Sequence, residues 1–276
     1  PDLNYRYHLG PDIQVGNIYP VMYAKTFFDG MKAEGQENII NLLRCAWAGS
    51  QKYGALVWSG DIKSSFPSMK NQVAAGLNMG IAGIPWWTTD IGGFFGANIN
   101  DPEFHELLVR WFEYGCFCPV MRLHGYRWPL QPQYGTTGGA TCVSGAPNEV
   151  WSYTDQVCEI LSDYLRLRER MLPYITELME EAHEKGTPVM RPLFYDFPED
   201  KESWNVETEY MFGPKVLVKP ITDADARETD VYLPGGASWT NAWTGETFEG
   251  GQKVHVAAPI EQIPLFTRDG YKLPMK

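Results

Sequence analysis

The stretch Leu56-Val-Trp-Ser-Gly-Asp61 decides the fold, together with Trp86-Trp-Thr-Thr-Asp-Ile-Gly-Gly-Phe94 downstream. Each is an apolar run that ends in an aspartate beside glycine or an aromatic residue. A buried strand that delivers a carboxylate to the mouth of a barrel has this pattern, and small ligands bind at that mouth. The two stretches therefore predict neighbouring parallel strands with acidic side chains at their carboxyl ends.

Helix and strand patterns alternate through the first half of the chain. Apolar spacing, turn residues and helix caps predict helices over residues 18–33, 68–80 and 101–115 and strands over 38–47, 54–61, 84–90 and 116–122. Alternating β and α units imply a parallel sheet with right-handed crossovers. A closed (β/α)8 barrel needs eight strands and about 250 residues. The sheet is therefore open, or it is the C-terminal half of a larger barrel, and the polar start without Met favours the half barrel.

The second half of the chain changes character twice. Residues 124–150 are rich in Gly, Pro and Thr and predict a long loop, and residues 152–185 predict a helix kinked at Pro173. Turn signals then separate short strands, which we expect at residues 211–221, 229–233, 239–243, 254–257 and 263–267. The predicted fold is thus α/β, with half a (β/α)8 barrel over residues 1–207 and a small all-β sandwich domain over residues 208–276.

Composition limits the function classes. The net charge of −11 argues against nucleic acid as a partner, and the longest apolar runs fall short of the roughly 18 residues that span a membrane. Aromatic residues make up 14% of the chain, which fits a large core or stacking platforms for a sugar. No signal peptide is visible. The odd, scattered cysteines predict buried free thiols in a reducing compartment, and hence a cytoplasmic location; they are Cys45, Cys116, Cys118, Cys142 and Cys158.

Four polar residues stand at or near the ends of the four predicted strands, namely Arg44, Asp61, Asp90 and His124. Any one of them fits a cap or a salt bridge, but four in succession indicate a site. Asp61 follows a glycine that permits a sharp turn, and Trp58 offers an apolar wall. Partial burial against such a wall raises the pKa of a carboxyl group, as a general acid requires.

The other strand-end residues have chemistry that suits a sugar. Asp90 can accept hydrogen bonds from hydroxyl groups, and Gly92-Gly93 beside it would allow a ligand to approach closely. Arg44 can donate to hydroxyls or pair with an acid, and His124 can donate to a hydroxyl or be a satisfied histidine at a strand end. Beyond these, we expect Arg122 and Arg127 to pair with local acids, and Glu149 and Trp151 to rim the site.

These motifs, taken in order, resemble glycoside hydrolase family 31. The matching stretches run from about residue 17 to residue 272; they include Arg44-Cys-Ala-Trp-Ala-Gly-Ser50, Trp58-Ser-Gly-Asp61, Asp90-Ile-Gly-Gly-Phe94, Met121-Arg-Leu-His124, Met190-Arg-Pro-Leu-Phe194, Tyr210-Met-Phe-Gly-Pro214 and Ile263-Pro-Leu-Phe266. That family comprises retaining α-glucosidases, α-xylosidases and relatives, built on a (β/α)8 barrel with β-domains around it.

The resemblance implies a role for each residue. Asp61 corresponds to the family's general acid/base, whereas Arg44, Trp58, Asp90, Phe94 and His124 correspond to residues that line the subsite of the terminal sugar. The family's nucleophile is an aspartate at the end of the fourth barrel strand, and this sequence opens as if cut just after it. We therefore expect the 276 residues alone to be inactive and to need the N-terminal half of the same enzyme as a partner.

The resulting hypothesis is a retaining, exo-acting α-glycoside hydrolase that acts on an α-linked oligosaccharide or glycoside without metal or organic cofactor. Its motifs look closest to bacterial α-xylosidases, and Trp86-Trp87 would crowd the hydroxymethyl group of glucose. An α-glucosidase of the same family is the alternative. A second hypothesis, of a different functional class, is a non-catalytic carbohydrate-binding or scaffold fragment. A metal-dependent hydrolase built on Asp61, Asp90 and His124 is a third and weaker hypothesis. A homo-oligomer is left open.

Overall fold

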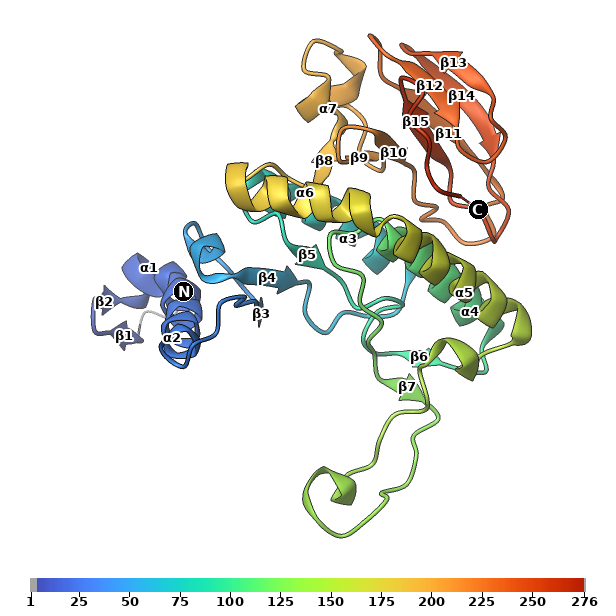
Figure 1. Ribbon diagram of the computed structural model, residues 1–276. Coiled ribbons are helices and arrows are strands. Elements are labelled where there is room, and N and C mark those ends of the chain that lie inside the picture. Colours follow the sequence, from blue (N-terminus) through green and yellow to red (C-terminus); the bar gives the residue numbers. More distant parts are fainter. Residues whose placement is uncertain (1–3, 276) are drawn as a thin grey trace.

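A three-stranded parallel sheet organises the N-terminal part of the molecule. In the computed structural model, which describes residues 4–275, its order is β3 (Asn41–Leu43), β4 (Ala55–Trp58) and β5 (Trp87–Thr88). Leu42 lies opposite Leu56, and Val57 lies opposite Trp87. Helix α2 (Tyr19–Ala33) precedes the sheet, α3 (Phe66–Ile81) connects β4 to β5, and α4 (Pro102–Cys116) follows β5 (Figure 1). The predicted alternation of strands and helices is confirmed.

Local sequence explains where these helices begin. Ser65 caps α3 by accepting from the Ser68 amide, and Asp101 caps α4 by accepting from the Glu103 amide at 3.0 Å. Each helix has proline in its first turn, where the missing N–H costs nothing. The later part of α4, from Leu107 to Cys116, is buried on every side, with Leu108 and Trp111 fully enclosed in the core.

Two predicted strands are wrong. Residues 116–122 form no strand, because α4 continues to Cys116 and Pro119 has no amide to donate. The segment still runs parallel to the edge of β5, with single bonds from the Val120 amide to the Trp87 carbonyl and from the Ile91 amide to the Arg122 carbonyl. Residues 211–221 form a hairpin of β9 (Tyr210–Phe212) and β10 (Val216–Val218), which turns at Gly213 with φ +59°.

The predicted long helix is confirmed as two helices, α5 (Asp155–Arg170) and α6 (Leu172–Lys185), with Pro173 in the first turn of the second. Helix α5 packs against α4 (Figure 1). The loop before it contains β7 (Arg127–Trp128), which pairs in parallel with β6 (Ala97–Asn98), and its tip projects away from the body of the molecule.

The C-terminal part is a β-sandwich, as predicted. Its larger sheet is antiparallel with the order β13-β12-β15-β10-β9-β8, and its second sheet pairs β11 with β14. The remaining bounds are β8 (Met190–Pro192), β11 (Glu228–Leu233), β12 (Ser238–Asn241), β13 (Thr247–Glu249), β14 (Gln252–Ala257) and β15 (Leu265–Arg268). Met211, Leu217, Val231, Trp239 and Phe266 belong to one buried cluster. The division predicted after residue 207 falls between β8 and β9, which are hydrogen-bonded neighbours.

Short elements complete the described chain. Near the N-terminus, β1 (Arg6–Tyr7) and β2 (Gly10–Pro11) pair and α1 (Asp12–Val15) follows. Helix α7 (Leu193–Asp196) follows β8. The five cysteines are free thiols. Cys116 and Cys118 are buried, but Cys45 and Cys142 are exposed, so the prediction that all the cysteines are buried is wrong. The two exposed cysteines lie outside helices and strands, and Cys142 is on the projecting loop.

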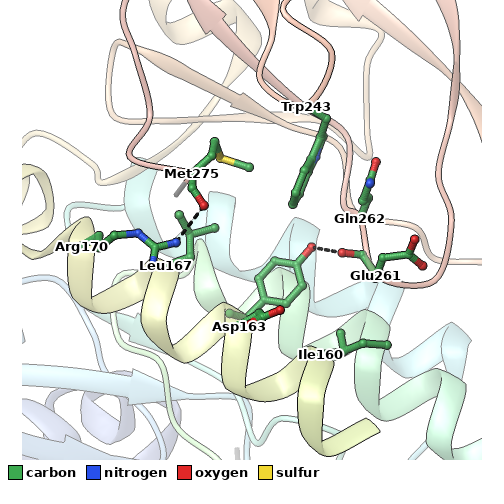
Figure 2. A pocket seen from close by; sticks show the side chains of 9 residues that line it. Ile160, Asp163, Leu167, Arg170, Trp243, Glu261, Gln262 and Met275 are labelled. Atoms are coloured by element: carbon green, nitrogen blue, oxygen red, sulfur yellow. Dashed lines mark hydrogen bonds between the residues drawn. The ribbon is translucent and has the colours of Figure 1, made fainter. Parts of the chain in front are cut away.

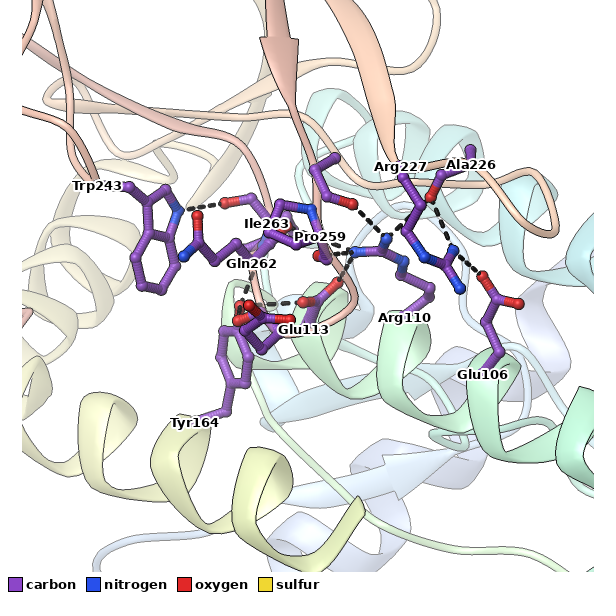
Figure 3. A network of polar contacts seen from close by, with 12 residues as sticks. Glu106, Arg110, Glu113, Tyr164, Ala226, Arg227, Trp243, Pro259, Gln262 and Ile263 are labelled. Carbon is purple, nitrogen blue, oxygen red and sulfur yellow. Dashed lines mark hydrogen bonds and ion pairs between the residues drawn. The ribbon is translucent and has the colours of Figure 1, made fainter. Parts of the chain in front are cut away.

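A buried polar network joins the two parts of the molecule (Figure 3). Arg110 of α4 has no exposed surface and pairs with Glu113 at 3.1 Å. Its guanidinium also donates to carbonyl oxygens of the C-terminal domain, those of Ala226 at 3.0 Å and Ala258 at 2.6 Å among them. Because a buried charge needs partners, and both Nη groups find theirs partly in the C-terminal domain, this arginine ties α4 to the β-sandwich.

Candidate active site

The carboxyl edge of the parallel sheet brings Arg44 and Asp61 together. Arg44 follows β3, Asp61 follows β4, and an Arg44 Nη2 group donates to Asp61 Oδ2 at 3.0 Å. The guanidinium carbon of Arg44 also lies 5.4 Å from the centre of the Trp58 ring, which is cation–π distance. Three of the predicted site residues thus form one contact group, as expected if parallel strands deliver their ends to the same edge.

Asp61 is more open than the sequence predicted. Its side chain is 41% exposed and that of Arg44 is 64% exposed, so Trp58 walls only one side of the pair. The reason is local: residues 59–65 form no helix or strand, and Gly60 turns the chain outward with φ +81°. The carboxyl group stands on an open edge of the described chain, where a large ligand can reach it.

Asp90 occupies the opposite kind of environment. It follows β5, its side chain has no exposed surface, and Oδ1 forms an ion pair with Arg122. Burial raises the pKa of the Asp90 carboxyl, and the positive charges of Arg122 and His124 oppose that rise. The prediction that Arg122 pairs with a local acid is confirmed.

Phe94 and His124 form an adjoining aromatic pair, with ring centres 5.5 Å apart. Arg122 links Asp90 to the group formed by Arg44, Trp58 and Asp61, because its guanidinium carbon also lies 6.0 Å from the centre of the Trp58 ring. The structure therefore brings all six predicted residues into one neighbourhood: Arg44, Trp58, Asp61, Asp90, Phe94 and His124.

The glycines after Asp90 serve the protein's own packing. A Cβ at Gly93 would lie 2.6 Å from Ser64 Cα, and one at Gly92 would lie 2.9 Å from Arg127. The expectation that these glycines admit a ligand is therefore wrong, because the chain itself fills the space beside them.

Four further residues differ from the sequence analysis. Within residues 4–275, Arg127 pairs with no acid: buried beneath the turn, it donates to the carbonyl oxygens of Gly93 at 2.8 Å and Ile91 at 3.2 Å. Trp87 is buried in the core beside Gly76, where it cannot crowd a sugar. Glu149 accepts from Ser152 at 2.9 Å, and with the exposed Trp151 it lines an apolar groove over α5.

An interdomain cavity of about 360 Å³ lies between α5 and the β-sandwich, lined by Tyr164, Trp243 and Met275 among others and apart from Asp61 (Figure 2). Among residues 4–275, no group of three or more His, Cys, Asp and Glu side chains is arranged to hold a metal ion. No helix in the same residues has the length and apolar character to cross a membrane.

Comparison with known proteins agrees with this geometry. The chain matches the "Glycosyl hydrolases family 31 TIM-barrel domain" over residues 3–178 and the "Glycosyl hydrolase family 31 C-terminal domain" over residues 186–273. It is 37% identical to an alpha-xylosidase of Saccharolobus solfataricus, over 96% of this chain and 34% of the relative. It is 34% identical to alpha-glucosidase 2 of Bacillus thermoamyloliquefaciens, over 93% of this chain and 30% of the relative.

A solved structure is also similar. The GH31 alpha-xylosidase from a soil metagenome, complexed with xylose, superposes with a TM-score of 0.93 at 55% identity, over 98% of this chain and 40% of that one. The chain spans about a third of the length of the curated relatives that it matches. Both of its parts match consecutive domains of one family, and the chain therefore belongs to glycoside hydrolase family 31.

Proposed function

We propose that this chain supplies the second half of the catalytic barrel to a retaining, exo-acting α-glycoside hydrolase, with Asp61 as general acid/base. The observation that carries the proposal is the Arg44–Asp61 pair at the carboxyl edge of the sheet, beside Trp58. Catalytic groups of (β/α)8 barrels lie at that edge, and glycoside hydrolysis needs a proton donor that a substrate can reach.

The proposed reaction has two steps. In the first, Asp61 protonates the oxygen that bridges the two sugars, while an aspartate from the other half of the barrel attacks the anomeric carbon. In the second, Asp61 removes a proton from the water that releases the sugar. Arg44 engages Oδ2 of Asp61, which leaves Oδ1 to carry the proton. Phe94 and His124 would line the subsite of the terminal sugar.

For the substrate we favour a terminal α-linked xylose, with an α-glucosidase as the alternative. Support comes from the relatives, since a structure 55% identical to this chain is an α-xylosidase complexed with xylose, whereas a relative at 34% identity is an α-glucosidase. The full-length protein should hydrolyse p-nitrophenyl α-xyloside faster than the α-glucoside at equal concentrations. Faster hydrolysis of the glucoside would decide for the alternative.

The role of Asp61 is tested by Asp61→Ala in the full-length protein. Loss of general acid catalysis should reduce turnover of natural glycosides by about 10²–10⁴-fold, whereas a glycosyl fluoride, which needs little protonation, should lose far less in the first step. The matched control is Asp163→Ala, since Asp163 is an exposed acid on α5. Equal and small losses on both substrates would contradict the assignment. Binding of sugar without turnover by the unmodified full-length protein would favour a scaffold function.

The need for the other half of the barrel has its own test. The isolated 276 residues should show no turnover, and addition of the N-terminal half should restore it. Activity from the isolated residues would contradict the assignment of the nucleophile to the other half.

A further inference from the structure

Two arginines share one tryptophan at the candidate site. The guanidinium carbons of Arg44 and Arg122 lie 5.4 Å and 6.0 Å from the centre of the Trp58 ring. Each arginine is also paired with an aspartate, Arg44 with Asp61 and Arg122 with Asp90. Trp58 is therefore the point at which the two ion pairs meet.

The two ion pairs differ in their access to solvent. Asp61 and Arg44 are open, whereas the Asp90 side chain has no exposed surface and that of Arg122 is 24% exposed. A fully buried carboxylate is a poor contact for a ligand, but it holds a charged partner firmly, because separating the pair leaves a buried charge without compensation. Asp90 therefore has the surroundings of a residue that fixes Arg122.

Arginine suits this position for a geometric reason. Its planar guanidinium can meet a carboxylate along one edge and lie over an aromatic ring with its face. A lysine would keep the charge but offers no planar face. The pairing of Arg122 with both Asp90 and Trp58 uses both properties.

We propose that Arg122 is a positioning residue for the acid/base site, and that Asp90 acts through Arg122 instead of contacting the sugar. The Asp90–Arg122 pair fixes Trp58, and Trp58 in turn sets where Arg44 holds Asp61. This inference rests on the proposed function of Asp61. It departs from the role as subsite lining that the family resemblance implied for Asp90.

The same pair balances charge beside the general acid. The charged and titratable groups that act on Asp90 are Arg122, His124, Asp61 and Arg127. Because Asp61 and Asp90 repel each other, Arg122 cancels a negative charge that Asp61 would otherwise feel. Asp90→Asn would leave Arg122 as an uncompensated cation, which favours the ionised form of a neighbouring acid.

Kinetics of the full-length protein test the proposal, with p-nitrophenyl α-xyloside as the probe. Arg122→Gln should lower kcat by about 10–100-fold with a smaller change in KM, since displacement of a catalytic group by about 1 Å costs up to about 10²-fold. Arg122→Lys should keep the pH profile but recover only part of kcat. Arg166→Gln removes an arginine from an exposed ion pair on α5 and serves as the control.

The pH profile separates positioning from simple loss of structure. The basic limb of kcat/KM reports the general acid of the free enzyme. Asp90→Asn should move that limb to lower pH by about half a unit or more, because the charge of Arg122 is then uncompensated. The double variant Asp90→Asn with Arg122→Gln should move the limb back, because both charges of the ion pair are then removed.

Three results would overturn the inference. The first is an unchanged kcat in Arg122→Gln, and the second is a kcat that falls only as far as the folded fraction measured by thermal unfolding. The third is a KM raised tenfold by Asp90→Asn with the basic limb unmoved, since this would show direct contact with the sugar. Failure of the proposed function itself is recognised separately, because Asp61→Ala would then retain turnover of natural glycosides.

Discussion

Removing one hydroxyl group from the network between the two domains should weaken the whole fold. The Tyr164 hydroxyl of α5 lies 3.1 Å from Glu113 Oε1 and 3.2 Å from the Glu261 carbonyl oxygen, and it accepts from the Ile263 amide at 3.0 Å (Figure 3). It thus connects the barrel helices to the irregular segment that leads into β15. Tyr164→Phe deletes these bonds and keeps the ring.

The structure sets the size of the effect. A hydroxyl group donates one hydrogen bond at a time, so Tyr164→Phe leaves two buried groups without partners: the Ile263 amide and either Glu113 Oε1 or the Glu261 carbonyl. Each buried group left unpaired costs about 1–3 kcal/mol. Because phenylalanine fills the same space, no cavity adds to this cost, and the expected loss in free energy of unfolding is about 2–6 kcal/mol.

Urea titration of the full-length protein measures the loss, with the slope checked for constancy between variants. Tyr134→Phe is the control, since Tyr134 is 79% exposed on the projecting loop and should change the free energy of unfolding by less than about 0.5 kcal/mol. A loss below about 0.5 kcal/mol in Tyr164→Phe would refute the view that this hydroxyl satisfies buried groups across the domain interface.

Two further variants test the packing and the buried acids. Gly93→Ala should lower the free energy of unfolding by well over the roughly 1 kcal/mol expected for the control Gly60→Ala. Both residues have positive φ, but only at Gly93 would the new Cβ meet backbone, 2.6 Å from Ser64 Cα. Equal losses in the two variants, measured by thermal unfolding, would argue against that contact. Burial raises the pKa of Glu209 to about 7, so its native form keeps a proton that the unfolded form releases near pH 4.5. Its stabilising contribution is full below pH 4.5 and falls by up to about 3 kcal/mol as the pH rises through 7. Urea titrations at several pH values should show this fall. The fall should be smaller in Glu209→Gln, where only other buried acids such as Glu113 contribute, whereas the exposed control Glu207→Gln should keep it in full.

Helices were the most predictable part of the fold. The apolar spacing of α4, its cap Asp101 and its first-turn proline all point to one element, and the structure has it within a residue of the predicted start. Helix signals are local, since the hydrogen bonds and caps of a helix lie within a few residues of each other along the chain.

Strands were less predictable because their partners are distant in sequence. Residues 116–122 have a strand-like composition, yet Cys116 is the last residue of α4, and Pro119 has no amide to continue the pairing with β5. Between Met211 and Ile221 the apolar run gives no sign of a hairpin except Gly213-Pro214, whose turn packs against Tyr174 and Leu178. Whether such a run is one strand or two depends on those long-range contacts.

Site residues divide along a similar line. The positions of Asp61 and Asp90 follow from the ends of apolar runs, but their contrast in burial does not, because it depends on which loop covers each one. Sequence reasoning expected both carboxylates to face a sugar, Asp61 as the general acid and Asp90 as an acceptor of hydrogen bonds from hydroxyl groups. The structure leaves only Asp61 accessible.

The arginines show why the rest needs three dimensions. Arg122 and Arg127 stand five residues apart, and from the sequence both were expected to pair with local acids. Arg122 pairs with a carboxylate, whereas Arg127 donates to carbonyl oxygens of the turn after β5. Arg110 likewise donates to carbonyl oxygens, those of the C-terminal domain. Backbone carbonyls are present at every residue and leave no mark in a sequence, so a buried arginine that binds them cannot be recognised there. An arginine that neutralises a buried aspartate also looks ordinary in sequence, although removing it would strand a charge. The two kinds differ in what their loss does: without Arg127 the turn after β5 loses hydrogen bonds to its carbonyl oxygens, whereas without Arg122 the Asp90 carboxylate beside the proposed general acid loses the cation that balances it.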